Sequence, residues 1–262
     1  MNAAFRLSVW LPLLAALASA AGLFAPGFYR DSPYLKTLWR GNDAVTLFVI
    51  VPALILSLWA YRRGSLRGLL LWMGLLLYLA YNYAFYLFAA AFNAAFPLYA
   101  ALLSVSGFAL VFGLSALPVR QLAFSTRRRG WIVAYLILIA AVLCGVEIPP
   151  IIRFLSDGTV PPLVEQTDHP TSVVYALDLT TVVPLSLLAA VWLWRNEKWG
   201  YILAVLMLVK GGTYGLVLTA NSLILKLTHT GEDLLLPFYL FVMLGGLAGL
   251  IWLLRPARAA PA

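Results

Sequence analysis

Charged side chains are scarce in this 262-residue sequence, at 11% of all residues against about 25% in an average soluble protein. Because 63% of the residues are hydrophobic, the composition excludes an ordinary soluble domain. Cysteine occurs once, at Cys144, which excludes a disulfide framework and a Cys-x-x-Cys redox pair. There is no Gly-rich phosphate loop and no polar stretch long enough to fold one, so we expect no ATP-driven pump within this chain.

Long apolar runs are abundant instead. Eight stretches of about 20 residues carry at most one charge each, and this length crosses a hydrocarbon core ~30 Å thick. The sequence therefore predicts an all-α, polytopic membrane protein with eight transmembrane helices, at residues 6–28, 44–61, 68–92, 97–117, 130–152, 172–194, 199–225 and 235–254.

The net charge of +8 is divided unequally between the loops. Twelve Lys and Arg residues fall on the loops of one side and five on those of the other. Basic loops face the cytoplasm in membrane proteins, so this asymmetry predicts a cell-membrane protein with both termini in the cytoplasm. The excess charge then contacts lipid headgroups, and the bilayer rather than a nucleic acid is the expected partner.

The spacing of polar residues in the third apolar run recurs in the seventh. The matched residues are separated by four and then seven positions in both runs: Asn82, Tyr86 and Asn93 in one, Lys210, Tyr214 and Asn221 in the other. Prolines recur in the same order in the other runs, at Pro26 and Pro149, Pro52 and Pro184, and Pro97 and Pro237. We therefore predict two tandem four-helix repeats, residues 1–119 and 120–262, which insert in parallel because each has an even number of spans.

The first run has a second interpretation. Arg6, an apolar stretch and the small residues Ala18, Ser19 and Ala20 also fit a secretory signal with its cleavage site. We favour retention, because the first run has a counterpart in the fifth.

Three ionisable residues are concentrated in the second repeat: Lys210, Asp178 and Glu147. Lys210 lies eleven residues after Trp199, at a depth of ~16 Å, and the two carboxylates lie at a depth of ~25 Å. An extended lysine side chain, on the order of 6 Å long, brings its ammonium close to their level. The three groups are predicted to form a substrate or proton site. The alternative is a buried salt bridge that only fixes helix packing.

The first repeat contributes neutral polar residues to the predicted site. Asn82 and Tyr86 share one helical face with Tyr78, four residues apart, and Tyr214 is the counterpart of Tyr86. This aromatic face either walls a ligand pocket or only packs. Gly212 and Gly215 follow Lys210 and favour the close approach of another helix.

Three functions are compatible with these residues. The first is a small-molecule carrier or ligand-binding membrane protein with a polar site at mid-membrane, to which Lys210, Asp178, Glu147, Asn82, Tyr86 and Tyr214 contribute. The second is a membrane-embedded enzyme acting on a lipid or isoprenoid, for which the sequence offers no nucleophile with a positioned base. A variant of this second function is a pigment protein that holds an aldehyde chromophore as a Schiff base on Lys210. The third is a non-catalytic subunit with membrane partners.

No cofactor is predicted, and an enzyme is the less favoured class. His169 and His229 lie near carboxylates in the outer loops, but no metal-ligand spacing is present, so no metal site is predicted.

Overall fold

The computed structural model describes residues 1–117, 119, 122–123, 129–167, 169–229, 235–255 and 258–259. These residues contain eight helical stretches long and apolar enough to cross a membrane: Asn2–Phe24, Pro33–Arg62, Leu66–Ala89, Phe96–Ser115, Gly130–Asp157, Val173–Trp194, Lys198–Thr228 and Leu236–Leu254. The prediction of an all-helical chain with eight such spans is confirmed. The only extended pairing within the described residues joins two residues of β1 (Leu122–Ala123) to two of β2 (Arg258–Ala259).

Two of the predicted spans differ from the structure by five residues or more at one end. The second begins at Pro33 rather than at residue 44, because a polar helix starts there and continues into the apolar run. Ser32 caps its first turn by accepting a hydrogen bond from the Leu35 amide, and Pro33 occupies the first helical position. The fifth span continues past Pro150 to Asp157, where Gly158 ends the helix in the left-handed conformation.

The chain divides into two compact units. Unit 1 consists of Met1–Ser125 and Val205–Ala262, and unit 2 of Thr126–Ala204. Helix α11 is divided between them, with residues 198–204 in unit 2. These two units differ from the two predicted repeats, which meet at residues 119 and 120. The duplication therefore stays a prediction.

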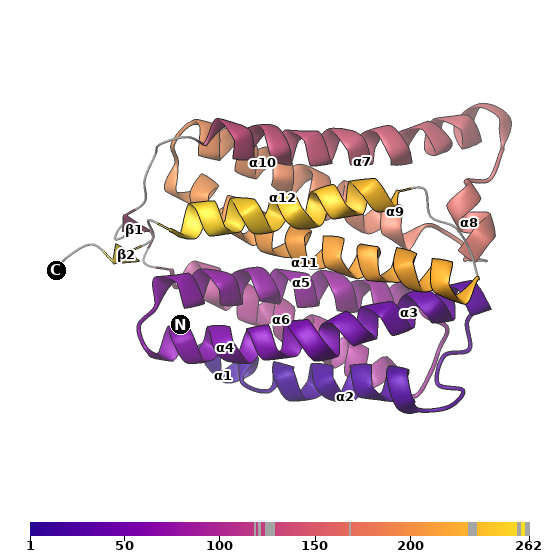
Figure 1. Ribbon diagram of the computed structural model, residues 1–262, viewed down its shortest axis with the longest axis horizontal. Helices are drawn as coiled ribbons and strands as arrows, with labels where there is room; N and C mark the ends of the chain where they lie inside the picture. The colour runs from indigo at the N-terminus through magenta and orange to yellow at the C-terminus, as the bar shows by residue number, and fades with distance from the viewer. Residues whose placement is uncertain are drawn as a thin grey trace. The chain divides into compact units, whose positions relative to one another are not determined.

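Unit 1 is built around α5, the most buried of its spans (Figure 1). Helices α4 and α6 lie on either side of it in sequence and both pack against it, and α1 and α2 pack on α6. The Trp72 indole on α5 donates to the Ser8 hydroxyl on α1. The elements of this unit are α1 (Asn2–Ser8), α2 (Leu11–Phe24), α3 (Pro33–Val45), η1 (Thr46–Ile50), α4 (Val51–Arg62), α5 (Leu66–Ala89), α6 (Phe96–Ser115), the two-residue β1 and β2, α11 (Lys198–Thr228) from residue 205 onward, and α12 (Leu236–Leu254).

Glycines allow α11 and α12 to approach closely, as the sequence predicts. A Cβ added to Gly246 would lie 2.7 Å from the Gly212 nitrogen, and one added to Gly215 would lie 2.6 Å from the Met243 nitrogen. These backbones touch, so larger residues do not fit between them.

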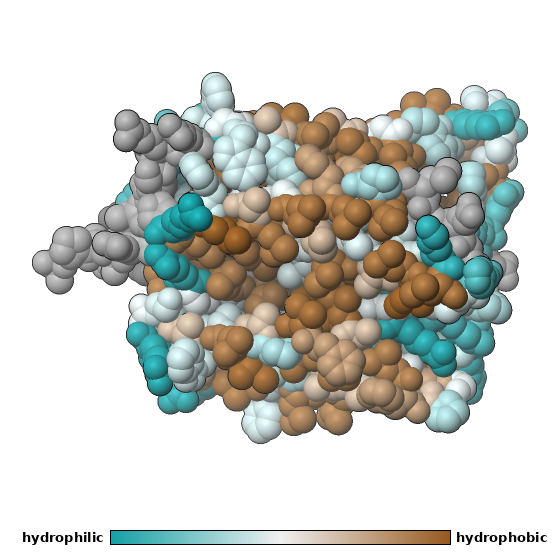
Figure 2. Space-filling view, viewed as in Figure 1, coloured by the Kyte–Doolittle hydropathy of each residue, from teal (hydrophilic) through white to brown (hydrophobic). Residues whose placement is uncertain are grey.

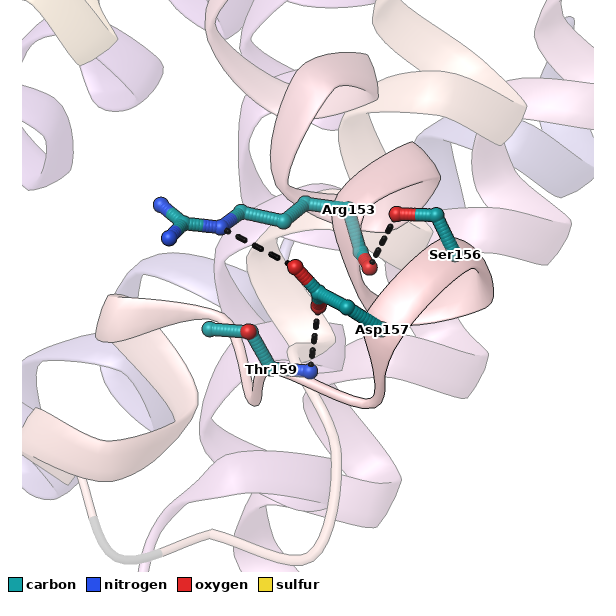
Figure 3. Close-up of polar contacts among 4 residues, drawn as sticks. All are labelled: Arg153, Ser156, Asp157 and Thr159. Carbon is teal, nitrogen blue, oxygen red and sulfur yellow. Dashed lines mark hydrogen bonds and ion pairs between the residues drawn. The ribbon is translucent and has the colours of Figure 1, made fainter.

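Unit 2 is a smaller helical group in which α7 packs along α10. Its elements are α7 (Gly130–Asp157), α8 (Pro162–Thr167), α9 (Val173–Leu177), η3 (Asp178–Val182), α10 (Val183–Trp194) and the start of α11. Figure 3 shows how α7 ends: Arg153 Nε lies 3.7 Å from Asp157 Oδ2, and Asp157 Oδ1 accepts a hydrogen bond from the Thr159 amide. These exposed groups belong to a helix end, and an exposed pair of this kind contributes little to stability.

Apolar side chains cover the middle stretches of the helices. Figure 2 shows brown, hydrophobic residues along these stretches and teal, hydrophilic residues gathered toward the helix ends. Large exposed apolar side chains occur within the spans, including Trp10, Leu56 and Phe88. Such a surface is suited to lipid and not to water.

Two spans contain a π-helical turn directly before a proline. In η1 the Val51 amide donates to Thr46 O, and in η3 the Val183 amide donates to Asp178 O, five residues back in each case. Pro52 and Pro184 follow as the second residues of α4 and α10. Proline has no N–H and its ring clashes with the carbonyl four residues earlier, so each of these prolines disturbs the α-helical hydrogen bonding where the π-turn lies.

The turn from α4 to α5 has the same hydrogen bonds as the turn from α10 to α11. Gly64 N donates to Tyr61 O and Ser65 N to Ala60 O. In the second turn the same pattern recurs 132 positions later, with Asn196 N donating to Leu193 O and Glu197 N to Trp192 O. Gly64 and Asn196 both have positive φ, at 78° and 62°. The two turns are therefore the same local structure.

Candidate functional site

The polar side chains inside unit 1 gather along α5. Tyr78, Asn82 and Tyr86 are spaced four residues apart on it, so they lie on one face, and all three are buried. Tyr78 Oη lies 3.1 Å from the Thr46 hydroxyl at the start of η1. The most buried helix of unit 1, α5, therefore places a polar side chain next to η1, the π-helical turn of span 2.

The ammonium group of Lys210 lies against two tyrosine rings. Lys210 Nζ is 3.7 Å from the centre of the Tyr81 ring and 4.7 Å from that of Tyr214, and the lysine is 5% exposed. The Tyr214 ring also lies 4.8 Å from Tyr81 and 6.1 Å from Tyr78, between centres. A cation over a tyrosine face is stabilised by the ring quadrupole, more strongly where water is excluded. We call Tyr78, Tyr81, Lys210 and Tyr214 the lysine–tyrosine cluster.

Asn82 is the residue of this region with the least satisfied side chain. It is 1% exposed, and neither its amide nitrogen nor its amide oxygen has a hydrogen-bond partner within the described residues. Leaving a buried polar group unpaired costs about 1–3 kcal/mol. Because native structures rarely tolerate such a cost without a reason, this amide is a candidate for contact with a ligand.

Tyr86 belongs to a second cluster, centred on a buried carboxyl group. Its hydroxyl lies 3.0 Å from Asp43 Oδ1, and the Tyr29 hydroxyl donates a short hydrogen bond to Asp43 Oδ2. The Tyr99 ring lies 5.1 Å from that of Tyr86, and the Tyr83 ring 5.8 Å from it. We call Tyr29, Asp43, Tyr83, Tyr86 and Tyr99 the aspartate–tyrosine cluster.

Sequence reasoning did not select Asp43 as a site residue. It assigned the start of span 2 to residue 44, which left Asp43 at the membrane edge. In the structure α3 begins eleven residues earlier, at Pro33, so Asp43 lies well inside a continuous span and is 3% exposed. The signal that was present in the sequence is the capped start at Ser32 and Pro33.

Asn42 and Asn221 join α3 to α11 within unit 1. The Asn221 amide donates to Asn42 Oδ1 over 2.8 Å, and both side chains are buried. Gly41 permits this approach, since a Cβ there would collide with the Asn221 side chain. The third residue of the polar pattern in the seventh span therefore pairs with an asparagine from span 2.

Asp178 and Glu147 are both buried in unit 2. Asp178 is the first residue of η3, and Glu147 lies in α7 two residues before Pro149. The structure thus brings Lys210 and Tyr214 together with α5 in unit 1. The predicted grouping of Lys210 with these two carboxylates stays a prediction.

Within the described part of the chain, no three His, Cys, Asp or Glu side chains are grouped as a metal site would require. Asp168, Glu232 and Asp233, the carboxylates expected near the histidines, lie outside the described residues. Unit 2 holds an open apolar groove of about 490 Å³, which contains none of the predicted site residues and is lined by Val133, Ile137, Ala190, Val191, Trp194 and Arg195.

Comparisons with known proteins found no protein family, no curated protein and no solved structure that matches the chain.

Proposed function

We propose that the chain is a multi-pass cell-membrane protein that binds, and carries across the bilayer, a small polar organic molecule held beside Asn82. The observation that supports this most directly is the buried and unpartnered Asn82 amide. An amide offers two donors and an acceptor, so it suits a ligand that carries both a hydrogen-bond donor and an acceptor. An acyl chain has neither, which argues against it as the natural occupant.

The lysine–tyrosine cluster provides the second part of the proposed site. Tyr81 precedes Asn82 on α5, and Tyr78 is one turn away. Their neighbour Lys210 adds a positive charge within unit 1, which would favour a ligand with an anionic or electron-rich group. Aromatic side chains with a few polar groups are the usual lining of small-molecule sites.

The irregular spans support a carrier over a rigid scaffold. Thr46 begins the π-turn of span 2, with Asp43 three residues before it, and Asp178 begins the π-turn of span 6. Single π-turns inside helices occur frequently at functional sites. Transporters also place their sites where helices are interrupted near the middle of the membrane.

The matching turns and π-helices support the proposed duplication into residues 1–119 and 120–262. They give an offset of 132 positions, whereas the polar pattern of the third and seventh spans gives 128. The two differ by four residues, which is about one helical turn, so Lys210 falls on the same helix face in either alignment. With the excess of basic residues on one set of loops, four spans per repeat favour a parallel insertion with both termini in the cytoplasm.

Replacing Asn82 with leucine should stabilise the protein while abolishing ligand binding. Leucine has a similar size and no polar atoms, so the free energy of unfolding should rise by about 1–3 kcal/mol. Thermal unfolding of the purified protein, with and without each member of a panel of amino acids, nucleosides, sugars and organic acids, measures both effects. A panel member that binds beside Asn82 should raise the melting temperature of the wild type and leave that of Asn82→Leu unchanged.

Asn42→Leu is the matched control, because this amide does have a partner. It should lower the free energy of unfolding by about 1–3 kcal/mol, since the buried Asn221 amide loses its acceptor. If Asn82→Leu destabilises the protein as much as Asn42→Leu does, Asn82 is a packing residue. If ligands stabilise Asn82→Leu and the wild type equally, the proposed site is wrong.

A further inference from the structure

Asp43 is a buried carboxyl group with no cationic partner. It is 3% exposed, and no lysine, arginine or histidine within the described residues forms an ion pair with it. Arg40, one turn earlier on α3, is exposed. An isolated carboxylate is costly to bury in an apolar interior, and it is normally paired or neutralised.

Neutral hydroxyl groups surround Asp43 on its other sides. The loop between α2 and α3 contributes Tyr29 and the separate carboxylate Asp31, and α2 contributes only the hydroxyl of Ser19. The hydroxyl groups from the remaining elements are those of Thr46, Tyr78, Tyr83, Tyr86 and Tyr99. The only other charges near Asp43 in sequence, on Lys36 and Arg40, lie on its own helix and make no ion pair with it. Among the residues that the structure describes, nothing packed against Asp43 compensates a full negative charge.

Tyr86 makes two contacts and has one hydrogen to donate. Tyr86 Oη lies 3.0 Å from the backbone oxygen of Trp39 and 3.0 Å from Asp43 Oδ1. A backbone carbonyl oxygen can only accept, so the hydrogen bond to Trp39 O uses the tyrosine hydrogen. With an ionised Asp43, that one hydrogen would have to be shared between the two acceptor oxygens. With a proton on Oδ1, the carboxyl group donates to Tyr86 Oη and each contact is a full hydrogen bond.

The other carboxyl oxygen fits the same assignment. Tyr29 Oη donates to Asp43 Oδ2. Burial holds the pKa of Tyr29 well above its usual range, so this hydroxyl keeps its hydrogen and remains a donor. A protonated Asp43 therefore accepts one hydrogen bond and donates one.

The cluster has no space for a larger cation. A single Cβ on Gly22 would collide with Asp43 Oδ2 and Tyr29 Oη, so the α2 side is closed. Ring centres of Tyr29, Trp39, Tyr86 and Tyr99 lie 4.8 to 6.5 Å apart around the carboxyl group. A metal ion requires several oxygen ligands arranged about a central space. Here the oxygens are within hydrogen-bond distance of one another, which fits a proton.

We propose that Asp43, with Tyr29 and Tyr86, is a proton-binding site inside unit 1. The Asp43 carboxylate takes up one proton on Oδ1, and the resulting O–H donates a hydrogen bond to Tyr86 Oη. Release of that proton leaves an uncompensated negative charge inside the unit. Carboxyl groups of this kind within membrane spans serve as proton relays. The site goes beyond the small-molecule site at Asn82, and its test does not require a ligand.

Infrared spectroscopy of the protein labelled with ¹³C at the aspartate carboxyl carbons tests this directly. A protonated carboxyl group has a carbonyl stretching band separate from those of ionised carboxylates. The wild type at neutral pH should show a labelled carboxyl band that Asp43→Asn removes. Asparagine has the same shape and can still accept from Tyr29 and donate to Tyr86, so the variant should fold. Asp31→Asn is the matched control and should retain the band, because Asp31 accepts from the Ala91 amide and forms no hydrogen bond with Tyr29 or Tyr86.

Tyr86→Phe provides an independent measurement if Asp43→Asn does not fold. It keeps the ring and removes the acceptor, so the carbonyl band of a protonated Asp43 should shift to higher frequency. A purely structural role of Tyr86 would leave the band in place. The proposal is overturned if the wild type shows no protonated aspartate at neutral pH, if Asp43→Asn retains the band, or if Tyr86→Phe does not move it.

Discussion

Gly200→Ala should prevent the protein from accumulating in a folded form, with a loss of about 3 kcal/mol or more in the free energy of unfolding. A Cβ at this position would collide with the backbone of Trp192 and Leu193, and it would lie 2.6 Å from Trp192 O. Backbone atoms cannot rotate away as a side chain can, so α10 and α11 would have to separate at their turn. The loss is measured by the yield of monodisperse protein and by unfolding in detergent.

The equivalent glycine of the other turn gives a graded comparison. A Cβ on Gly68 would lie 2.7 Å from the Ala60 Cβ and 2.8 Å from Tyr61 N, so Gly68→Ala should also destabilise, but less than Gly200→Ala. Gly107→Ala and Gly145→Ala are the controls, because nothing lies within 4 Å of a Cβ at either position. Alanine favours a helix over glycine by about 1 kcal/mol, so both should be as stable as the wild type or more so. Equal stability of all four variants would contradict the close packing at the two turns.

Lys210→Glu should be the most damaging charge substitution in unit 1. It places a carboxylate where the ammonium now lies against the Tyr81 and Tyr214 rings. Ring faces repel an anion, and this repulsion replaces a cation–ring attraction that is worth about 2 kcal/mol where water is excluded. The free energy of unfolding should fall by at least this amount, as measured by unfolding in mixed detergent micelles. Lys210→Met keeps a long side chain without the charge, so it should lower the free energy of unfolding by less than Lys210→Glu does.

Lys226→Glu is the control on the same helix. Lys226 lies near the end of α11 and is exposed, so reversal of its charge should change the free energy of unfolding by no more than about 0.5 kcal/mol. If Lys210→Glu is as well tolerated as Lys226→Glu, the ammonium group does not occupy the position between the two rings. A difference between the two variants that persists at high salt indicates a buried rather than a surface charge, since salt screens surface charges.

The spans were predictable because each apolar run has to match the thickness of a bilayer, and this requirement acts locally along the chain. The start of span 2 was not predictable in this way, because α3 is polar and its position depends on burial against other helices. Pro33 and Ser32 mark that start in the sequence, but a capped start does not reveal whether the helix continues into the next apolar run.

Residues within one helix turn could likewise be grouped from the sequence. Lys210 and Tyr214 are four residues apart, and so are Tyr78 and Asn82, so each pair shares a face in any α-helix. The partners across helices could not be predicted. The sequence did not single out Tyr81, and the predicted span limits left Asp43 at the membrane edge. Their roles depend on which helix faces which, and apolar periodicity carries little of that information when every face of a helix is apolar.

Composition and the lengths of the apolar runs were enough to predict an all-helical membrane protein with eight spans and a few ionisable residues inside them, because these are properties of single segments. The packing of the helices was needed to show that Lys210 meets the rings of Tyr81 and Tyr214, that Asn82 is buried with no partner among the described residues, and that Asp43 is enclosed by tyrosine hydroxyls. Those contacts join residues 14 to 129 positions apart, and packing between helices rather than local spacing sets them.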